Sequence, residues 1–68
     1  MGDKYNAARS EWYRPFRLNM WSARARWDDE RKVWLIQAVD HENMVFQGEA
    51  PGVLSPEEAL DHAELLAP

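Results

Sequence analysis

The sequence contains no cysteine, so disulfide bonds, thiolate metal sites and a cysteine nucleophile are excluded. Threonine is absent as well, and the three glycines are too scattered to form a phosphate-binding loop. None of the few serines lies in a nucleophile elbow. The longest apolar run, Val33–Ile36, is far shorter than the roughly 20 residues of a membrane-spanning helix. We therefore expect neither an enzyme nor a membrane protein, and we expect no cofactor.

The two histidines form no metal-binding pattern. His41 lies between Asp40 and Glu42, and His62 follows Asp61, a spacing that fits no known zinc motif. We interpret both histidines as solvated side chains, and we predict no metal site.

A chain of 68 residues is one small domain, here spanning 1–68. Cores of chains below roughly 70–80 residues seldom supply more than about 3–5 kcal/mol. Since disulfides are excluded, stability must come from aromatic burial or from association with another chain. The four tryptophans, two tyrosines and two phenylalanines suit aromatic burial, because each large ring buries about 150–250 Å².

The net charge of −4 is unevenly distributed along the chain. Residues 1–32 carry all eight lysines and arginines with five acids, whereas residues 33–68 carry seven acids and no basic residue. Such asymmetry indicates either an interaction segment or an attraction between the two halves of the fold. We favour the attraction.

The composition also bears on the origin of the chain. Arginine outnumbers lysine six to two and alanine occurs nine times, a bias that is typical of high-GC bacteria and their phages. Residues 1–4 lead into polar sequence rather than an apolar segment, which argues against a secretory signal. We therefore expect a cytoplasmic location and a bacterial or phage accessory protein.

The clearest element is a helix over 56–67. Ser55 is a good N-cap, Pro56 suits the first helical position, and Glu58 completes a capping box with Ser55. The apolar residues form one stripe and the acids lie on the opposite side, whereas Leu65 lies off the stripe. The helix therefore packs through one face only.

The middle of the chain has the pattern of β-strands. Residues 33–39 are apolar on both alternating faces, which is typical of a central strand covered on both sides. A second strand follows over 44–49, with Met44 among its inward residues. Residues 16–27 alternate with a slip in phase, which a β-bulge near Met20–Trp21 would explain. Turns are predicted at 28–31 and 40–43.

These elements predict an α+β fold. A three-stranded antiparallel meander over 16–50 is followed by a C-terminal helix over 55–67 on one face. Residues 1–15 form a short N-terminal helix or an arm, since Tyr5 and Trp12 lie at helical spacing.

One helix covers only one face of such a sheet, although the central strand is apolar on both faces. The second face is closed either by the N-terminal segment or by another chain, and two open edges invite strand pairing. We therefore predict a small non-enzymatic protein-interaction module that binds a protein partner or self-associates as a homo-oligomer.

The alternative is nucleic-acid binding through residues 9–27. This stretch interleaves arginines with aromatic residues around a single acid, Glu11, a composition that binds phosphates and stacks bases. The discriminating feature is whether the arginines share a face with the tryptophans. The candidate partner-binding residues are Trp12, Tyr13, Arg14, Arg17, Trp21, Arg24, Arg26 and Leu65.

Two segments carry a family resemblance. Trp27–Trp34, with its acidic turn and aromatic strand, and Pro56–Glu64, with its Glu-Glu-Ala opening, are similar to HicB-type antitoxin domains. The resemblance covers about residues 18–67 and implies an antitoxin-type domain. The Asp-x-Pro-Gly element of that family is missing after the second strand, and we transfer no functional residue from it.

Overall fold

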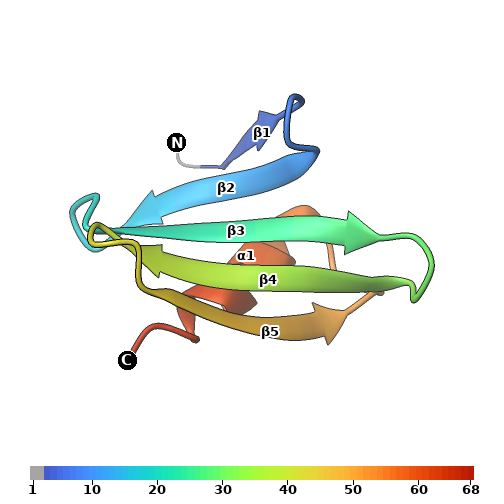
Figure 1. The fold of residues 1–68 in the computed structure, drawn as a ribbon. Coiled ribbons are helices and arrows are strands. Elements are labelled where there is room, and N and C mark those ends of the chain that lie inside the picture. Colours follow the sequence, from blue (N-terminus) through green and yellow to red (C-terminus); the bar gives the residue numbers. More distant parts are fainter. Residues whose placement is uncertain (1–2) are drawn as a thin grey trace.

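A computed structural model describes residues 3–68 and shows five strands in one antiparallel sheet, with a single helix packed on one side (Figure 1). The elements are β1 (Lys4–Asn6), β2 (Glu11–Phe16), β3 (Trp21–Asp28), β4 (Val33–Asp40), β5 (Val45–Pro51) and α1 (Pro56–Glu64). Neighbouring strands in the sheet are consecutive in the chain, so the sheet is a meander of hairpins.

The α+β class is confirmed, but the three-stranded sheet is wrong, because the N-terminal segment forms two further strands instead of a helix or arm. Tyr5 and Trp12 are direct cross-strand partners, and their ring centroids lie 5.1 Å apart. The spacing between Tyr5 and Trp12, which is compatible with two turns of a helix, therefore comes from a β-hairpin. Asn6 begins the turn, since its Oδ1 accepts a hydrogen bond from the Ala8 amide at 3.1 Å.

The slip in phase within residues 16–27 is a second hairpin turn and not a β-bulge. Phe16 at the end of β2 lies directly opposite Trp21 at the start of β3. Between them, Leu18 and Asn19 have positive φ angles of 56° and 69°. Such turns usually contain Asn-Gly or Gly-Gly, so a Leu-Asn pair does not predict a hairpin turn.

The turns predicted at 28–31 and 40–43 are confirmed. In each, an aspartate closes the turn by accepting backbone hydrogen bonds through Oδ1: Asp28 from Glu30 and Arg31, and Asp40 from Glu42 and Met44. Met44, expected to point inward in the second strand, instead precedes β5 and is exposed.

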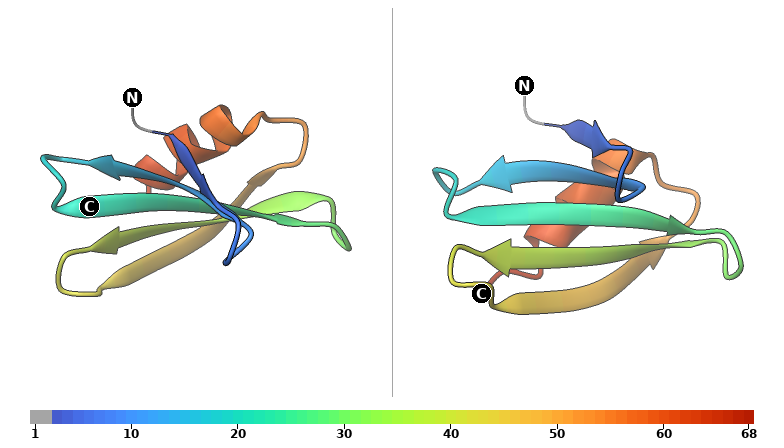
Figure 2. Two further views of the ribbon diagram at one scale, coloured as in Figure 1. Left: turned by 90° about the horizontal axis from the view of Figure 1, so that it is seen from above. Right: turned by 45° about the horizontal axis from the view of Figure 1, so that its top comes forward.

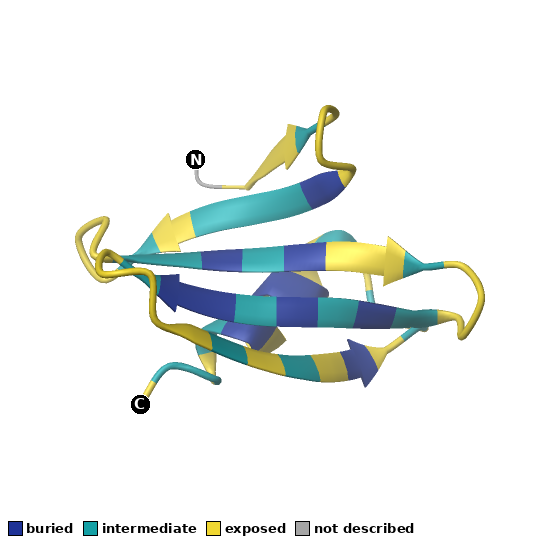
Figure 3. Cartoon of the chain, in the orientation of Figure 1, coloured by how far each residue is buried: buried dark blue, intermediate teal, exposed yellow. Residues whose placement is uncertain are grey.

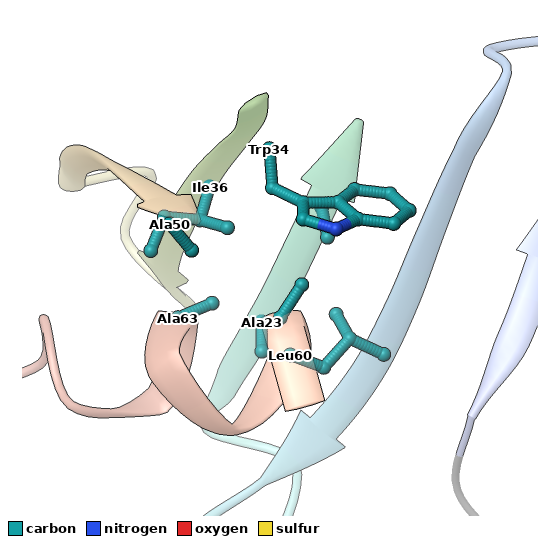
Figure 4. Packing of buried hydrophobic residues seen from close by; sticks show 8 residues of the cluster. Ala23, Trp34, Ile36, Ala50, Leu60 and Ala63 are labelled. Carbon is teal, nitrogen blue, oxygen red and sulfur yellow. The ribbon is translucent and has the colours of Figure 1, made fainter. Parts of the chain in front are cut away.

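The register of the strands gives the sheet two different faces. All four tryptophans lie on the face toward α1. There Trp34 fills the space above the helix and donates its Nε1 hydrogen to the Leu54 carbonyl at 3.0 Å, while alanines let the helix approach the strands (Figure 4). The buried core consists of Ala23, Ala25, Trp34, Ile36, Ala50, Ala59, Leu60 and Ala63.

The helix begins as predicted and ends at Glu64, earlier than expected. Ser55 Oγ accepts from the Glu58 amide at 3.1 Å, and Glu58 Oε1 accepts from the Ser55 amide at 2.9 Å, which confirms the capping box. After the helix, Leu65 is exposed, whereas Leu66 packs over Gly48 of β5. This contact brings the end of the chain to the β5 side of the sheet.

Candidate functional site

The face of the sheet opposite α1 is covered by no other segment among residues 3–68 (Figures 1 and 2). The hairpin of β1 and β2 extends the sheet at one edge, so the N-terminal segment does not close this second face. We call it the helix-free face. Its side chains are Lys4, Asn6, Glu11, Tyr13, Pro15, Ser22, Arg24, Arg26, Asp28, Val33, Leu35, Gln37, Val39, Val45, Gln47, Glu49 and Pro51.

Arg24 lies in the middle of the helix-free face. It is half-buried on β3, with Tyr13 of β2 on one side and Gln37 of β4 on the other. Arg24 lines each of three adjacent hollows on this face. Within the described part of the chain its guanidinium takes part in no salt bridge and in no side-chain hydrogen bond.

Glu11 is a buried carboxylate beside this arginine. It is only 5% exposed, it lines two of the hollows, and it accepts a hydrogen bond from Arg9 Nε at 3.1 Å. The register that pairs Trp12 with Ala25 puts Glu11 across from Arg26. Sequence reasoning noted Glu11 only as the single acid within residues 9–27 and did not predict its burial, because residues 1–15 were interpreted as a short helix or an arm.

Apolar side chains surround the charged centre. Val39 is buried, Leu35 and Tyr13 are half-buried, and the register places all three on the helix-free face. Figure 3 shows how buried and half-buried stretches alternate along β4 in this part of the sheet. A mixture of tyrosine, arginine and aliphatic residues is typical of protein–protein contact surfaces.

Three other candidate residues are engaged within the chain. Trp12 packs against the core, and the Trp21 ring lies 6.0 Å from Phe16 and 5.9 Å from Phe46. The Arg17 guanidinium lies 5.6 Å from the Trp21 ring centroid and donates to the Pro68 carbonyl at 2.8 Å. Of the predicted set, the helix-free face therefore brings together Tyr13, Arg24 and Arg26, while Leu65 is exposed after α1.

Arg14 joins β2 to the helix. Its guanidinium binds Asp3 at 2.6 Å, Asp61 at 2.6 Å and Glu64 at 2.9 Å, and it also donates to the Glu57 carbonyl at 3.1 Å. Arg31 forms a further ion pair with Glu49. The pairs of Arg14 with Asp61 and Glu64, and of Arg31 with Glu49, join the basic first half to the acidic second half. The predicted attraction between the halves is therefore confirmed within one chain.

Replacing Arg14 with methionine is expected to lower the free energy of unfolding at pH 7 by about 1 kcal/mol, because three partly solvated carboxylates lose their partner. The hydrogen bond from Arg14 holds the pKa of Asp3 below its ordinary value. A lowered pKa stabilises the fold above the unfolded-state value of about 3.9, and this contribution is lost as the pH falls through the folded-state pKa. Urea titrations at pH 7, 5 and 3 should show that the difference in the free energy of unfolding between wild type and Arg14→Met becomes smaller at pH 3.

Arg31→Met is the control, because its ion pair with Glu49 is more exposed and is expected to matter less. A loss in Arg14→Met that stayed constant down to pH 3 would contradict the electrostatic interpretation.

The tryptophans and the two arginines of the helix-free face do not share a surface. Trp21 and Trp27 alternate with Arg24 and Arg26 along β3, and Trp27 packs edge-on against Trp34 on the helix side. Arg24 and Arg26 therefore form no common platform with the indole rings of the kind that stacks bases.

Among residues 3–68, no group of three or more histidine, aspartate or glutamate side chains is arranged so that it could hold a metal ion. His41 lies in the turn between β4 and β5, 3.8 Å from Glu42, and His62 lies on α1. None of the helical structure in the described range is long and apolar enough to span a membrane.

Comparisons with known proteins add no functional information. The chain matches no family model, and neither a curated protein nor a solved structure is significantly similar to it. The similarity to HicB-type antitoxin domains thus stays a resemblance of two short segments.

Proposed function

We propose that this protein is a small protein-interaction module that binds a partner protein on its helix-free face, with Arg24 at the centre of the contact. The supporting observation is that Arg24, a half-buried residue in the middle of this face, has no ion-pair partner among residues 3–68. A guanidinium that becomes buried in a protein contact needs an opposite charge to pair with it. A carboxylate is the group on a protein that a planar guanidinium binds best.

The surroundings of Arg24 define the chemistry of the partner further. Leu35 and Tyr13 supply apolar area on the same face as Arg24, so the matching surface carries an acidic residue flanked by apolar ones. The molecule measures 31 × 23 × 18 Å, and its broad side is comparable with the roughly 800 Å² per partner of a standard interface.

Nucleic-acid binding stays the alternative prediction, but the separation of the tryptophans from Arg24 and Arg26 speaks against it. The composition supports a cytoplasmic accessory protein of a bacterium or phage as part of the same proposal.

The proposal is tested by affinity capture from a lysate of the source organism, with and without nuclease. Immobilised wild-type protein and Arg17→Glu, the matched control in the β2–β3 turn, are expected to retain the same protein. Arg24→Glu is expected to retain at least about tenfold less, because charge reversal repels the partner's carboxylate. Circular dichroism checks that each variant is folded.

Two outcomes would overturn the proposal. In one, Arg24→Glu captures the partner as well as wild type does. In the other, nuclease removes the captured material, which would favour the nucleic-acid alternative.

A further inference from the structure

The strand β5 forms a long open edge of the sheet. The opposite edge, β1, has only three residues and carries Lys4, and short length and lysine are common protections against strand pairing. By contrast, β5 extends over seven residues in uninterrupted register with β4. Its single charged residue, Glu49, is bound by Arg31 at 2.9 Å.

The outer backbone groups of β5 follow from the turn that precedes it. The Asp40 amide donates to the Met44 carbonyl at 3.0 Å, which closes the hairpin. Hydrogen-bonded and non-hydrogen-bonded pairs alternate from that point, so Val45, Gln47 and Glu49 direct their N–H and C=O groups away from β4. Pro51, which has no N–H, occupies the next outward position, as expected at an edge.

These outward groups are free to pair with another strand. Within residues 3–68, no backbone hydrogen bond from a turn, loop or helix end reaches Val45, Gln47 or Glu49. Each of the three therefore offers one donor and one acceptor along this edge of the sheet.

We propose that two copies of the chain associate through β5, antiparallel about a two-fold axis at Gln47, so that their sheets become one continuous sheet. In this register Gln47 faces Gln47 of the second copy, and Val45 faces Glu49. All three outward residues then have a backbone partner. With the axis at residue 46, Glu49 would lie opposite Asn43, which is outside β5. With the axis at residue 48, Val45 would lie opposite Pro51, which has no N–H to donate.

The side chains of β5 fit this register on both faces. Toward α1, Phe46 faces Gly48 of the second copy, so a large side chain meets a small one on each side of the axis. Leu66 lies over Gly48, with a methyl carbon 3.3 Å from where a Cβ would stand, and it provides an apolar neighbour for the incoming Phe46 ring.

On the helix-free face, no like charges meet across the axis. The Gln47 side chains face one another and can exchange amide hydrogen bonds, and each Glu49 faces a valine. The two-fold axis is perpendicular to the sheet, so both helix-free faces lie on the same side. The proposal extends that surface and does not depend on Arg24 binding a partner.

Cysteine cross-linking tests the pairing directly, because the chain has no cysteine of its own. In the proposed dimer the two Cα atoms of residue 47 are about 5.5 Å apart, a separation that a disulfide spans readily. Gln47→Cys is therefore expected to form a covalent dimer rapidly under mild oxidation. Tyr5→Cys, on the opposite edge, is the matched control and is expected to cross-link at least about tenfold more slowly.

Mass measurement by light scattering provides the second test. The wild-type chain is expected to show twice its mass of 8.0 kDa at high micromolar concentration. Gln47→Lys places two ammonium groups across the axis and is expected to weaken association at least about tenfold, with unchanged circular dichroism. Asn6→Lys, the same kind of change on β1, should associate like wild type.

The proposal is overturned if the wild-type chain stays monomeric up to about 1 mM, since β5 would then be free for a strand of a different protein. It is also overturned if Gln47→Cys cross-links no faster than Tyr5→Cys, or if Gln47→Lys dimerises like wild type. None of these results depends on Arg24, so they leave the proposed function to its own test.

Discussion

Replacing Gly52 with alanine is expected to leave most of the protein unfolded at room temperature. A Cβ at this position would overlap the Lys32 carbonyl oxygen and would lie 3.1 Å from the Trp27 ring. Lys32 cannot move away easily, because it has a φ of 58° in the β3–β4 turn and its amide donates to the Asp28 carbonyl at 2.8 Å.

The size of this effect follows from the small core. Overpacking costs about 1–3 kcal/mol and more when the obstacle is backbone, whereas a core of this size supplies about 3–5 kcal/mol in all. Thermal unfolding followed by circular dichroism measures the change.

Gly48→Ala is the matched control for this experiment. Its new Cβ would meet only the end of the Leu66 side chain, at 3.3 Å, and that side chain can shift. We expect a change below about 1 kcal/mol in the free energy of unfolding. A Gly52→Ala protein with a melting temperature close to that of wild type would show that the turn is more adaptable than its geometry indicates.

Replacing Leu60 with alanine is expected to have an effect of similar size. Leu60 is 0% exposed and is the largest fully buried side chain, held between α1 and the sheet. Removing a buried leucine costs about 2–5 kcal/mol through lost burial and the cavity left behind. Since this range covers the whole expected stability, urea titration followed by tryptophan fluorescence should show a shallow or missing folded baseline.

Leu65→Ala provides the control, because Leu65 is 80% exposed one residue after the helix. At the same protein concentration, we expect its free energy of unfolding to stay within about 0.5 kcal/mol of wild type. Equal destabilisation by the two substitutions would mean that α1 does not pack on the sheet as described.

The alternation of residues along the strands predicted part of the candidate site. Alternation along β3 already separated Arg24 and Arg26 from Trp21 and Trp27. Alternation does not say which of two faces a helix will cover, so Arg24 and Arg14 looked equivalent. The structure distinguishes them, because Arg14 binds carboxylates of α1, whereas Arg24 lies on the helix-free face.

The number of strands could not be predicted from the sequence for a related reason. Tyr5 and Trp12 are seven positions apart, a separation compatible with two turns of helix and with opposite places in a hairpin. Leu18 and Asn19 form a tight turn without the glycine that usually marks one. In both cases the ambiguity is removed by cross-strand packing, which a local pattern does not contain.

By itself, the sequence determined the features that depend on neighbouring residues. The start of α1 at Ser55 and the aspartate turns after Asp28 and Asp40 are of this kind, because caps and turns form between groups a few positions apart. Only the tertiary structure decided the five-stranded sheet, the face that α1 covers and the free edge at β5. These depend on contacts such as Arg14 with Asp61, between residues that only the folded chain brings together.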